Sequence, residues 1–332
     1  MLGIKPWLDF SGQVALLRAR GLSIPDETRA AKYLERIGYY RLSGYWHVFR
    51  QWDNSKQILL DTFIPGSDFE SVLSLYLFDK KLRLLALDAL ERIEMAIRVD
   101  IVQVLGKRNP LAYKYEAYLD GRFTRTKGVH ASKHQEWLKR FEQAQQREIR
   151  KGRKMQRSNK DKSEPTNFVT HNLEKYGVLP IWVASSLWDF GAMSYLYEGM
   201  QYTDRNTIAQ KYGALVNVPG QKNPDNLFVN WLRSLNEIRN IAAHHDRLWN
   251  ATLKDTSPPI DKDGYWKRLE HTRPFFYFCI MQTMLKVLCP RSQWATRFND
   301  LLLAFPNCKG TRCDLSRFGW IDDYQNWDLW RK

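Results

Sequence analysis

One stretch of this chain carries residues whose types and spacing suit work on a phosphate group. Arg239, Asn240 and His244 stand in the order R-N-x-x-x-H within residues 230–250, NWLRSLNEIRNIAAHHDRLWN. Asn236, Asn240 and His244 are each four residues apart, so a helix would align them along one face. Arg239 would lie beside this face. The pattern indicates a site that handles phosphate; a solvated helix face with a capped end is the plainer alternative.

Cleavage of RNA without a metal ion is the chemistry that these residue types favour. A base takes the proton from the 2′-hydroxyl, an acid protonates the leaving 5′-oxygen, and a cation stabilises the charge of the transition state. His244 suits either proton transfer and Arg239 suits the cationic role. Asn240 could orient the histidine or bind a phosphate oxygen through its amide.

The number of histidines predicts a dimer. His245 follows His244 directly and would lie about 100° round a helix, so it fits the same face poorly. Each chain then has one well-placed histidine, whereas the reaction needs two groups for its two proton transfers. Two copies of the motif that meet across a symmetric dimer would supply the second histidine.

The motif must be positioned by other helices, because its segment carries an apolar face that needs partners. The apolar residues recur at helical intervals: Trp231, Leu235, Ile238 and Ala242. The longest helical pattern begins at Ser67, where Ser67 and Glu70 fit a capping box, and ends at Asn109. At ~1.5 Å per residue this helix would exceed ~50 Å, which predicts a bend or break.

One ion pair within the long helix bears on the motif. Glu94 and Arg98 are four residues apart, and an exposed pair between them is the favoured interpretation. In the alternative, Glu94 points into the bundle and orients Arg239.

Shorter helices precede the long one. We expect an amphipathic helix over 5–22. A second helix is expected to start at Pro25, since proline suits the first helical position, and to continue into 37–52, IGYYRLSGYWHVFRQW. A short hairpin fits residues 53–66. Rings and aliphatic residues at helical spacing are predicted to be core: Tyr39, Leu42, Tyr45, Trp46 and Phe49. Three basic residues interleave with these rings and could contact RNA: Arg41, His47 and Arg50. Core packing of the rings is favoured over RNA contact as the role of this stretch.

Residues 111–164 have the composition of a basic insertion. Residues 147–164 hold eight basic residues against three acidic ones. Helical propensity is fair up to about Ile149, and residues 151–163 have so little to bury that they are predicted to be mobile in isolation. The same charge could contact an RNA backbone, or it could be a solvated surface. The candidate RNA-binding residues are Arg147, Arg150, Lys151, Arg153, Lys154 and Arg157.

The rest of the chain also reads as helices. We expect helices over 180–201, 203–212 and 265–289, a loop over 213–226, and an irregular Trp-rich tail over 291–332. Predicted core residues of the first of these are Trp182, Leu187, Phe190 and Tyr197. No strand alternation is sustained, so the fold class is all-α, built as a helical bundle.

The charge and the aromatic content of the chain indicate which kinds of molecule it would bind. The 332 residues include 51 Lys and Arg against 36 Asp and Glu, a net charge of +15, and 13 Trp. Basic and aromatic residues together are typical of single-stranded RNA recognition, although an anionic membrane surface or an acidic protein would also be attracted. The four cysteines form no C-x-x-C pair and no zinc pattern. Adjacent His244 and His245 diverge on a helix, so no metal site is predicted with His271.

Cellular location follows from what the sequence lacks. The N-terminal residues MLGIKPWLDFSG have no apolar run of a signal peptide, and the longest apolar run, 274–281, is too short to span a bilayer. A chain of this size needs no disulfides. We therefore expect a cytoplasmic protein without a membrane partner.

Four blocks of the chain resemble a known family. Residues 239–250, RNIAAHHDRLWN, closely resemble the signature of abortive-infection (Abi) proteins of the AbiD/AbiF type, which belong to the HEPN superfamily of all-helical ribonuclease domains. The other blocks follow in the family's order: IGYYRLSGYW (37–46), SLYLFDKKLRLLALDALERIE (74–94) and LPIWVASSLWDFGAMSYLY (179–197). The resemblance runs from about Lys5 to about Cys289. Ala242 departs from it, since many relatives have Cys there.

The resemblance implies a fold and an activity. It implies a HEPN-type bundle over 67–290 that contains the basic insertion, with an N-terminal helical region over 1–66 and a separate tail over 291–332. The implied protein is a toxin-like, metal-independent endoribonuclease that needs no cofactor. It would dimerise through the motif helices, act in phage defence, and be similar to the RNA-guided ribonucleases of type VI CRISPR systems. A small RNA or a protein antitoxin could restrain it.

The implied site and its alternative can be stated by residue. The catalytic set is Arg239, Asn240 and His244, and the supporting residues are Glu94, Asn236 and His245. The alternative function is a non-catalytic RNA-binding HEPN module, which a small RNA could bind and regulate. A purely structural scaffold would neither bind nor cleave RNA.

Overall fold

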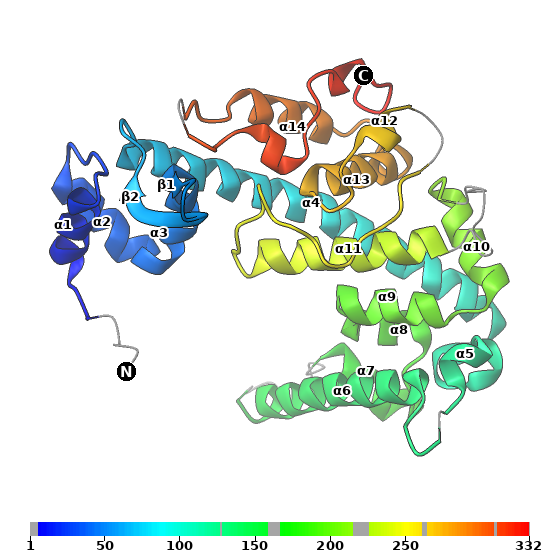
Figure 1. Ribbon diagram of the computed structural model, residues 1–332. Helices are drawn as coiled ribbons and strands as arrows, with labels where there is room; N and C mark the ends of the chain where they lie inside the picture. Colours follow the sequence, from blue (N-terminus) through cyan, green and yellow to red (C-terminus); the bar gives the residue numbers. More distant parts are fainter. Residues whose placement is uncertain are drawn as a thin grey trace.

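Helices dominate the structure (Figure 1). The computed structural model describes residues 6–126, 128–158, 167–214, 226–260, 264–308 and 311–331. The described part contains helices throughout and one small antiparallel sheet of two strands. The predicted all-α class is confirmed.

The longest helix, α4 (Phe69–Arg108), spans the molecule and packs against most of the others (Figure 1). It is continuous over 40 residues, so the predicted break is absent. Asp68 caps its first turn by accepting from the backbone N of Ser71 at 2.8 Å. The predicted capping box is therefore wrong by one residue. The Ser67 side chain is buried, and Glu70 pairs with Arg29 instead.

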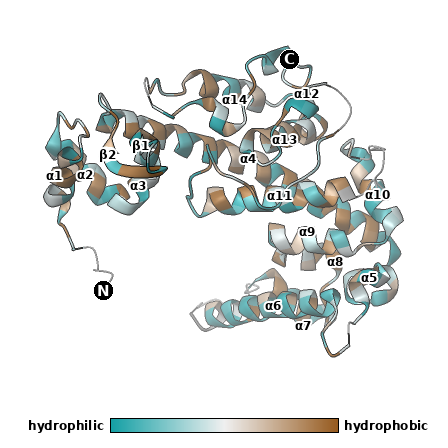
Figure 2. Cartoon of the chain, viewed as in Figure 1, coloured by the Kyte–Doolittle hydropathy of each residue, from teal (hydrophilic) through white to brown (hydrophobic). Residues whose placement is uncertain are grey.

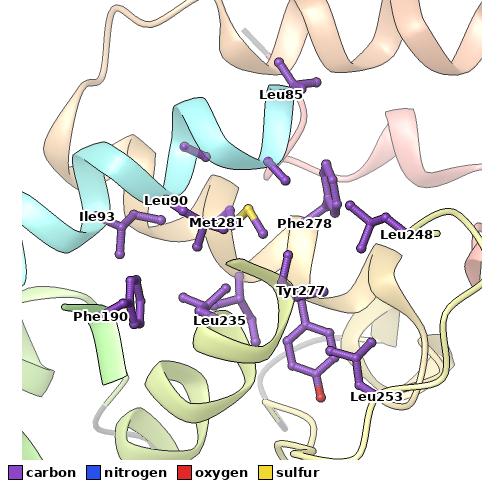
Figure 3. Close-up of a cluster of buried hydrophobic side chains, with 14 of the residues drawn as sticks. Leu85, Leu90, Ile93, Phe190, Leu235, Leu248, Leu253, Tyr277, Phe278 and Met281 are labelled. Atoms are coloured by element: carbon purple, nitrogen blue, oxygen red, sulfur yellow. The ribbon is translucent and has the colours of Figure 1, made fainter. Parts of the chain in front are cut away.

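The motif helix α11 (Asn226–Ala243) lies along α4 and is covered by α13 (Pro274–Leu288). Figure 3 shows side chains of α4, α11 and α13 gathered in one core, among them Ile93, Leu235 and Met281. The expected helix over 265–289 is two elements, α12 (Gly264–Arg268) and α13. Pro274 starts α13, because proline suits the first helical turn and cannot continue a preceding one.

The tail is more ordered than the sequence indicated. It contains α14 (Trp294–Leu303), which packs on α4, and two short 3₁₀ segments, Leu315–Phe318 and Tyr324–Asn326. The ring of Trp294 is buried, and its Nε1 donates to the carbonyl O of Leu85 at 2.9 Å. The prediction of an irregular tail is wrong for this part, since its tryptophans pack into the core.

The N-terminal region sits at one end of α4 (Figure 1). Its elements are α1 (Phe10–Ala19), α2 (Glu27–Ile37), α3 (Tyr39–Trp46), β1 (Arg50–Asp53) and β2 (Ile58–Phe63). A hairpin is present, but it begins three residues earlier than the expected 53–66, with Arg50 opposite Phe63. The expected continuous helix breaks at Gly38, whose φ of +90° suits glycine. Four of the five predicted core residues of this stretch are buried, and Tyr39 is partly buried.

The basic insertion folds into short helices and one long one. These are α5 (Gly121–Thr124), α6 (Lys133–Ser158) and, beyond it, α7 (Phe168–Tyr176), preceded by 3₁₀ turns at Ala112–Lys114 and Glu116–Tyr118. The helix continues to Ser158, where mobility was predicted; residues 159–166 lie outside the described part. The physical reason is a tertiary contact. Gly152 is buried against α7, and Nδ2 of Asn167 donates to the carbonyl O of Glu148 at 2.8 Å.

The apolar block after α7 is also divided. It forms α8 (Ile181–Ala184), a 3₁₀ turn and α9 (Phe190–Gly199), followed by α10 (Tyr202–Lys211). Asp189 starts α9 by accepting from the backbone N of Ala192 at 2.7 Å, which explains the break in the helix expected over 180–201. Trp182, predicted as core, is exposed. Most of the loop expected over 213–226 lies outside the described residues.

Candidate active site

The R-N-x-x-x-H motif occupies the C-terminal end of α11. The four predicted apolar residues of this helix are fully buried: Trp231, Leu235, Ile238 and Ala242. They pack towards α4, α9 and α13. Because that face is sealed, the polar residues of the motif lie on the remaining, open face.

Three polar side chains on the open face form one wall of a cleft. Asn236, Arg239 and Asn240 are partly exposed, and Nη1 of Arg239 donates to Oδ1 of Asn240 at 3.2 Å. The cleft measures about 370 Å³, and its other walls come from α6 and from residues 187–195. That volume lies in the range of about 300–1,000 Å³ that is usual for small-molecule sites. The structure thus brings three predicted site residues to one concave surface.

Two arginines of α6 lie across the cleft from the motif. Arg140 and Arg147 line it, and because they are two helical turns apart they share one face of α6. With Arg239 they bring three guanidinium groups to a cleft that has one acidic lining residue, Asp189. Such a cleft attracts anions. Arg147 was predicted from the sequence, while Arg140 was missed, although the spacing of seven residues could have indicated it.

His244 stands just beyond the end of α11. Its backbone N still donates to the carbonyl O of Asn240 at 2.9 Å, so the predicted alignment with Asn240 persists. Its side chain is exposed and open to a substrate. His245 has a φ of +62°, and the backbone N of Asp246 returns to the carbonyl O of Ile241 at 2.8 Å. This left-handed cap ends the helix, and it begins a segment, 244–250, that we call the histidine turn.

A buried carboxylate of α4 holds the histidine turn in place. Asp79 accepts from the backbone N of Leu248 at 3.1 Å and from that of Trp249 at 2.8 Å. It also accepts from the hydroxyl of Tyr45 at 2.6 Å and pairs with Arg83, which is buried as well. Sequence reasoning missed this role, because Asp79 lies 169 residues before Leu248.

The N-terminal region holds the same turn from the other side. Nη1 of Arg41 donates to the carbonyl O of His245, and Nη1 of Arg247 donates to the carbonyl O of Gly44. The block at 37–46 and the block at 239–250, which resemble the same family, are therefore direct neighbours. Their contact is what fixes the position of the histidine turn.

Glu94 lies near the motif but bonds to another arginine. The predicted ion pair with Arg98 is present, yet it is largely buried, with side chains 19% and 16% exposed. Nη2 of Arg98 also donates to the carbonyl O of Trp188 at 2.8 Å, which keeps the pair inside. Burial raises the pKa of Glu94, and the guanidinium groups of Arg98 and Arg239 partly offset this shift. Glu94 and Arg239 line the same hollow, so the carboxyl group lies beside the arginine of the motif.

Most of the predicted basic run lies away from the cleft. Arg147 lines it, whereas the residues that follow extend along α6, which is largely hydrophilic (Figure 2). Arg150, Lys151, Arg153 and Lys154 are exposed there, and Lys151 pairs with Glu148 at 2.6 Å. Arg157 belongs to α6, but its side chain lies outside the described part.

The described residues show neither a metal-binding cluster nor a membrane-spanning helix. There, no three His, Cys, Asp or Glu side chains gather as metal ligands would. Within the same ranges, every helix is too short or too polar to cross a membrane. The described residues include four cysteines that form no disulfide bond: Cys279, Cys289, Cys308 and Cys313.

The fold and the site together define a class and a family. The chain is an all-α protein that presents an R-N-x-x-x-H motif at the end of a helix, beside a basic cleft. It belongs to the Abi-like protein family, whose sequence profile matches residues 32–250. Membership of this family indicates a role in abortive infection, a form of phage defence. No curated protein and no solved structure matches the chain.

Proposed function

We propose that this protein is a metal-independent endoribonuclease of abortive infection. The observation that carries the proposal is the placement of Arg239 and Asn240 in the cleft lined by Arg140 and Arg147, with the exposed His244 four residues beyond Asn240 at the end of α11. The resemblance to AbiD/AbiF-type proteins of the HEPN superfamily supports it. The net charge of +15 suits a polyanionic substrate.

The proposed reaction uses the ribose next to the scissile phosphate. A histidine removes the proton of the 2′-hydroxyl, a bond forms between the 2′-oxygen and phosphorus, and the bond from phosphorus to the 5′-oxygen breaks. The leaving oxygen takes up a proton, so the products are a 2′,3′-cyclic phosphate and a 5′-hydroxyl. Arg239 stabilises the added negative charge on the phosphate oxygens, and Asn240 orients its guanidinium group.

Two proton transfers require two groups, and each chain offers one well-placed histidine, His244. We therefore propose a composite site in which two copies of the motif face one phosphate. The helix α4 supplies a surface for the contact. Leu84, Met95 and Val99 lie on one face of α4 and are 59%, 50% and 51% exposed. Met95 and Arg239 line the same hollow, so a second copy that covers this stripe would come close to the motif.

The proposal is tested by RNA cleavage in the presence of EDTA. Wild type should produce 2′,3′-cyclic phosphate ends. His244→Ala and Arg239→Ala should each lose at least about 100-fold in rate, as when a stabilising group at a reacting centre is removed. His171→Ala, which alters an exposed histidine of α7, is the matched control and should cleave normally. Cleavage that requires a divalent metal, or that survives in His244→Ala, would refute the proposal.

A second function, RNA binding without turnover, has one observation in its favour. The three arginines of the cleft would hold phosphate groups whether or not a reaction follows. Tight, salt-sensitive RNA binding by a wild-type protein that leaves the strand intact would support this alternative.

A further inference from the structure

Basic side chains from three distant parts of the chain meet on the stretch that contains His47. Nη1 of Arg247 lies at the carbonyl O of Gly44, and a Cβ on Gly44 would be 3.6 Å from that nitrogen. Arg312 reaches the same stretch: its backbone N donates to the carbonyl O of Val48 at 3.4 Å, and its Nη2 to that of Arg50 at 3.1 Å. Arg247 and Arg312 thus lie on either side of His47.

A third arginine completes the group, which we call the tail cluster: His47, Arg247, Arg312 and Arg317. Arg317 belongs to the 3₁₀ segment Leu315–Phe318 of the tail. Burial lowers the pKa of His47, and the positive charges of Arg247, Arg50, Arg312 and Arg317 lower it further. Burial and Arg317 together also lower the pKa of Arg312. Arg317 follows Arg312 by five residues, and Arg312 ties this part of the tail to the backbone of Val48 and Arg50, so the charge of Arg317 lies near the same stretch.

Carboxylates do not balance this charge. Across the described ranges, Arg247, Arg312 and Arg317 make no ion pair with Asp or Glu. Neighbouring arginines do: Arg50 pairs with Asp61, and Arg83 with Asp79. Asp79, the acid that acts on Arg247, is already engaged with Arg83 and the histidine turn.

Structural bonds use only part of this donor capacity. A guanidinium group carries five N–H donors, and the bonds of Arg247 and Arg312 to backbone carbonyls leave most of them free. The side chain of His47 is exposed, and those of the three arginines are partly exposed. Grouped cations that are open to solvent and lack acidic partners are suited to bind phosphate.

We propose that the tail cluster binds backbone phosphates of the RNA strand that enters the active site. The inference rests on the proposed function for its choice of ligand. Arg247 lies three residues after His244, and Arg41 bonds to the carbonyl O of His245, so this surface adjoins the histidine turn. A strand held at His244 would pass over it. The tail thereby gains a role in binding the substrate, although it lies outside the family match at 32–250.

The test measures the affinity for a fluorescein-labelled, fully 2′-O-methylated RNA strand, which cannot be cleaved by 2′-hydroxyl attack. Anisotropy titrations over a salt series compare wild type with Arg312→Gln/Arg317→Gln. Loss of two phosphate contacts should weaken binding about tenfold at about 0.15 M salt and reduce the salt slope by about 1.4. The matched control is Arg36→Gln/Arg291→Gln, which removes the same charge from exposed sites elsewhere. Equal losses in both double variants would overturn the proposal.

Two further measurements keep the result interpretable. Arg317→Gln alone leaves the bonds of Arg312 intact and should weaken binding about fourfold, so misfolding cannot account for the effect. On cleavable RNA, the double variant should raise KM with little change in kcat. If wild type binds RNA but never cleaves it, the proposed function fails while the cluster still stands. Loss of binding to phosphatidylserine vesicles, with RNA affinity unchanged, would overturn the cluster's assignment to RNA.

Discussion

At the scale of residues, Arg239 and His245 differ in what makes them unusual: Arg239 is notable for the position of its charge, and His245 for the geometry of its backbone. Arg239 lines both the basic cleft and the hollow that contains Glu94 and Met95, so it lies where two surfaces meet. His245 lines neither of these two surfaces, and its unusual feature is its left-handed backbone conformation. A left-handed conformation at a residue other than glycine costs about 1–2 kcal/mol, and such strain is typical of functional sites.

Substitution of His245 tests this strain. His245→Gly should unfold with a free energy about 1 kcal/mol higher than His245→Ala, because both variants lack the imidazole and only glycine adopts a φ of +62° without strain. Urea denaturation followed by circular dichroism measures the difference. Equal stabilities would show that the turn relaxes to another conformation.

At the scale of elements, the cleft depends on how α6 packs against α9, across the cleft from α11. Arg140 and Arg147 should bind RNA there, so Arg140→Gln/Arg147→Gln should lower kcat/KM for RNA cleavage by about tenfold, the factor expected when two phosphate contacts are lost. Steady-state cleavage rates provide the measurement. Arg150→Gln/Arg153→Gln, on the same helix but off the cleft, is the control. A similar decrease in both double variants would mean that net charge, rather than the cleft, governs binding.

The histidine turn depends on a second contact between elements. Asp79→Ala should destabilise the fold by about 3–5 kcal/mol, because the buried Arg83 would lose its acidic partner and two backbone N–H groups would lose their acceptor. Denaturant unfolding checks this value. Asp88→Ala breaks the more exposed pairs with Arg92 and Arg297 and should cost at most about 1 kcal/mol. Comparable losses would show that Asp79 does not anchor the turn.

Local patterns predicted some of these elements well. The apolar face of α11 and the start of α4 to within two residues follow from periodicity and capping residues. The apolar stretch at 180–201 did not reveal its break, since a segment that is apolar on most sides has no periodicity to interrupt. Contacts such as Asp79 with Leu248 join residues far apart in sequence, so only the folded chain places them.

At the scale of the whole molecule, the proposed composite site requires two copies of the chain. Met95→Glu places a charge in the exposed apolar stripe of α4, so it should shift the protein towards monomer in sedimentation experiments and reduce cleavage in parallel. Leu303→Glu, at an exposed position of α14, is the control. A wild-type monomer that cleaves at full rate, or a Met95→Glu variant that behaves like wild type in both assays, would contradict the composite site.

The central claim is that the 2′-hydroxyl of RNA is the nucleophile at a site built from Arg239, Asn240 and His244. The most direct test is a strand with a single 2′-deoxy residue on the 5′ side of a mapped cut. The account predicts that this bond stays intact while the all-ribose strand is cut there. Cleavage of the 2′-deoxy strand at the same bond and at an undiminished rate would contradict it.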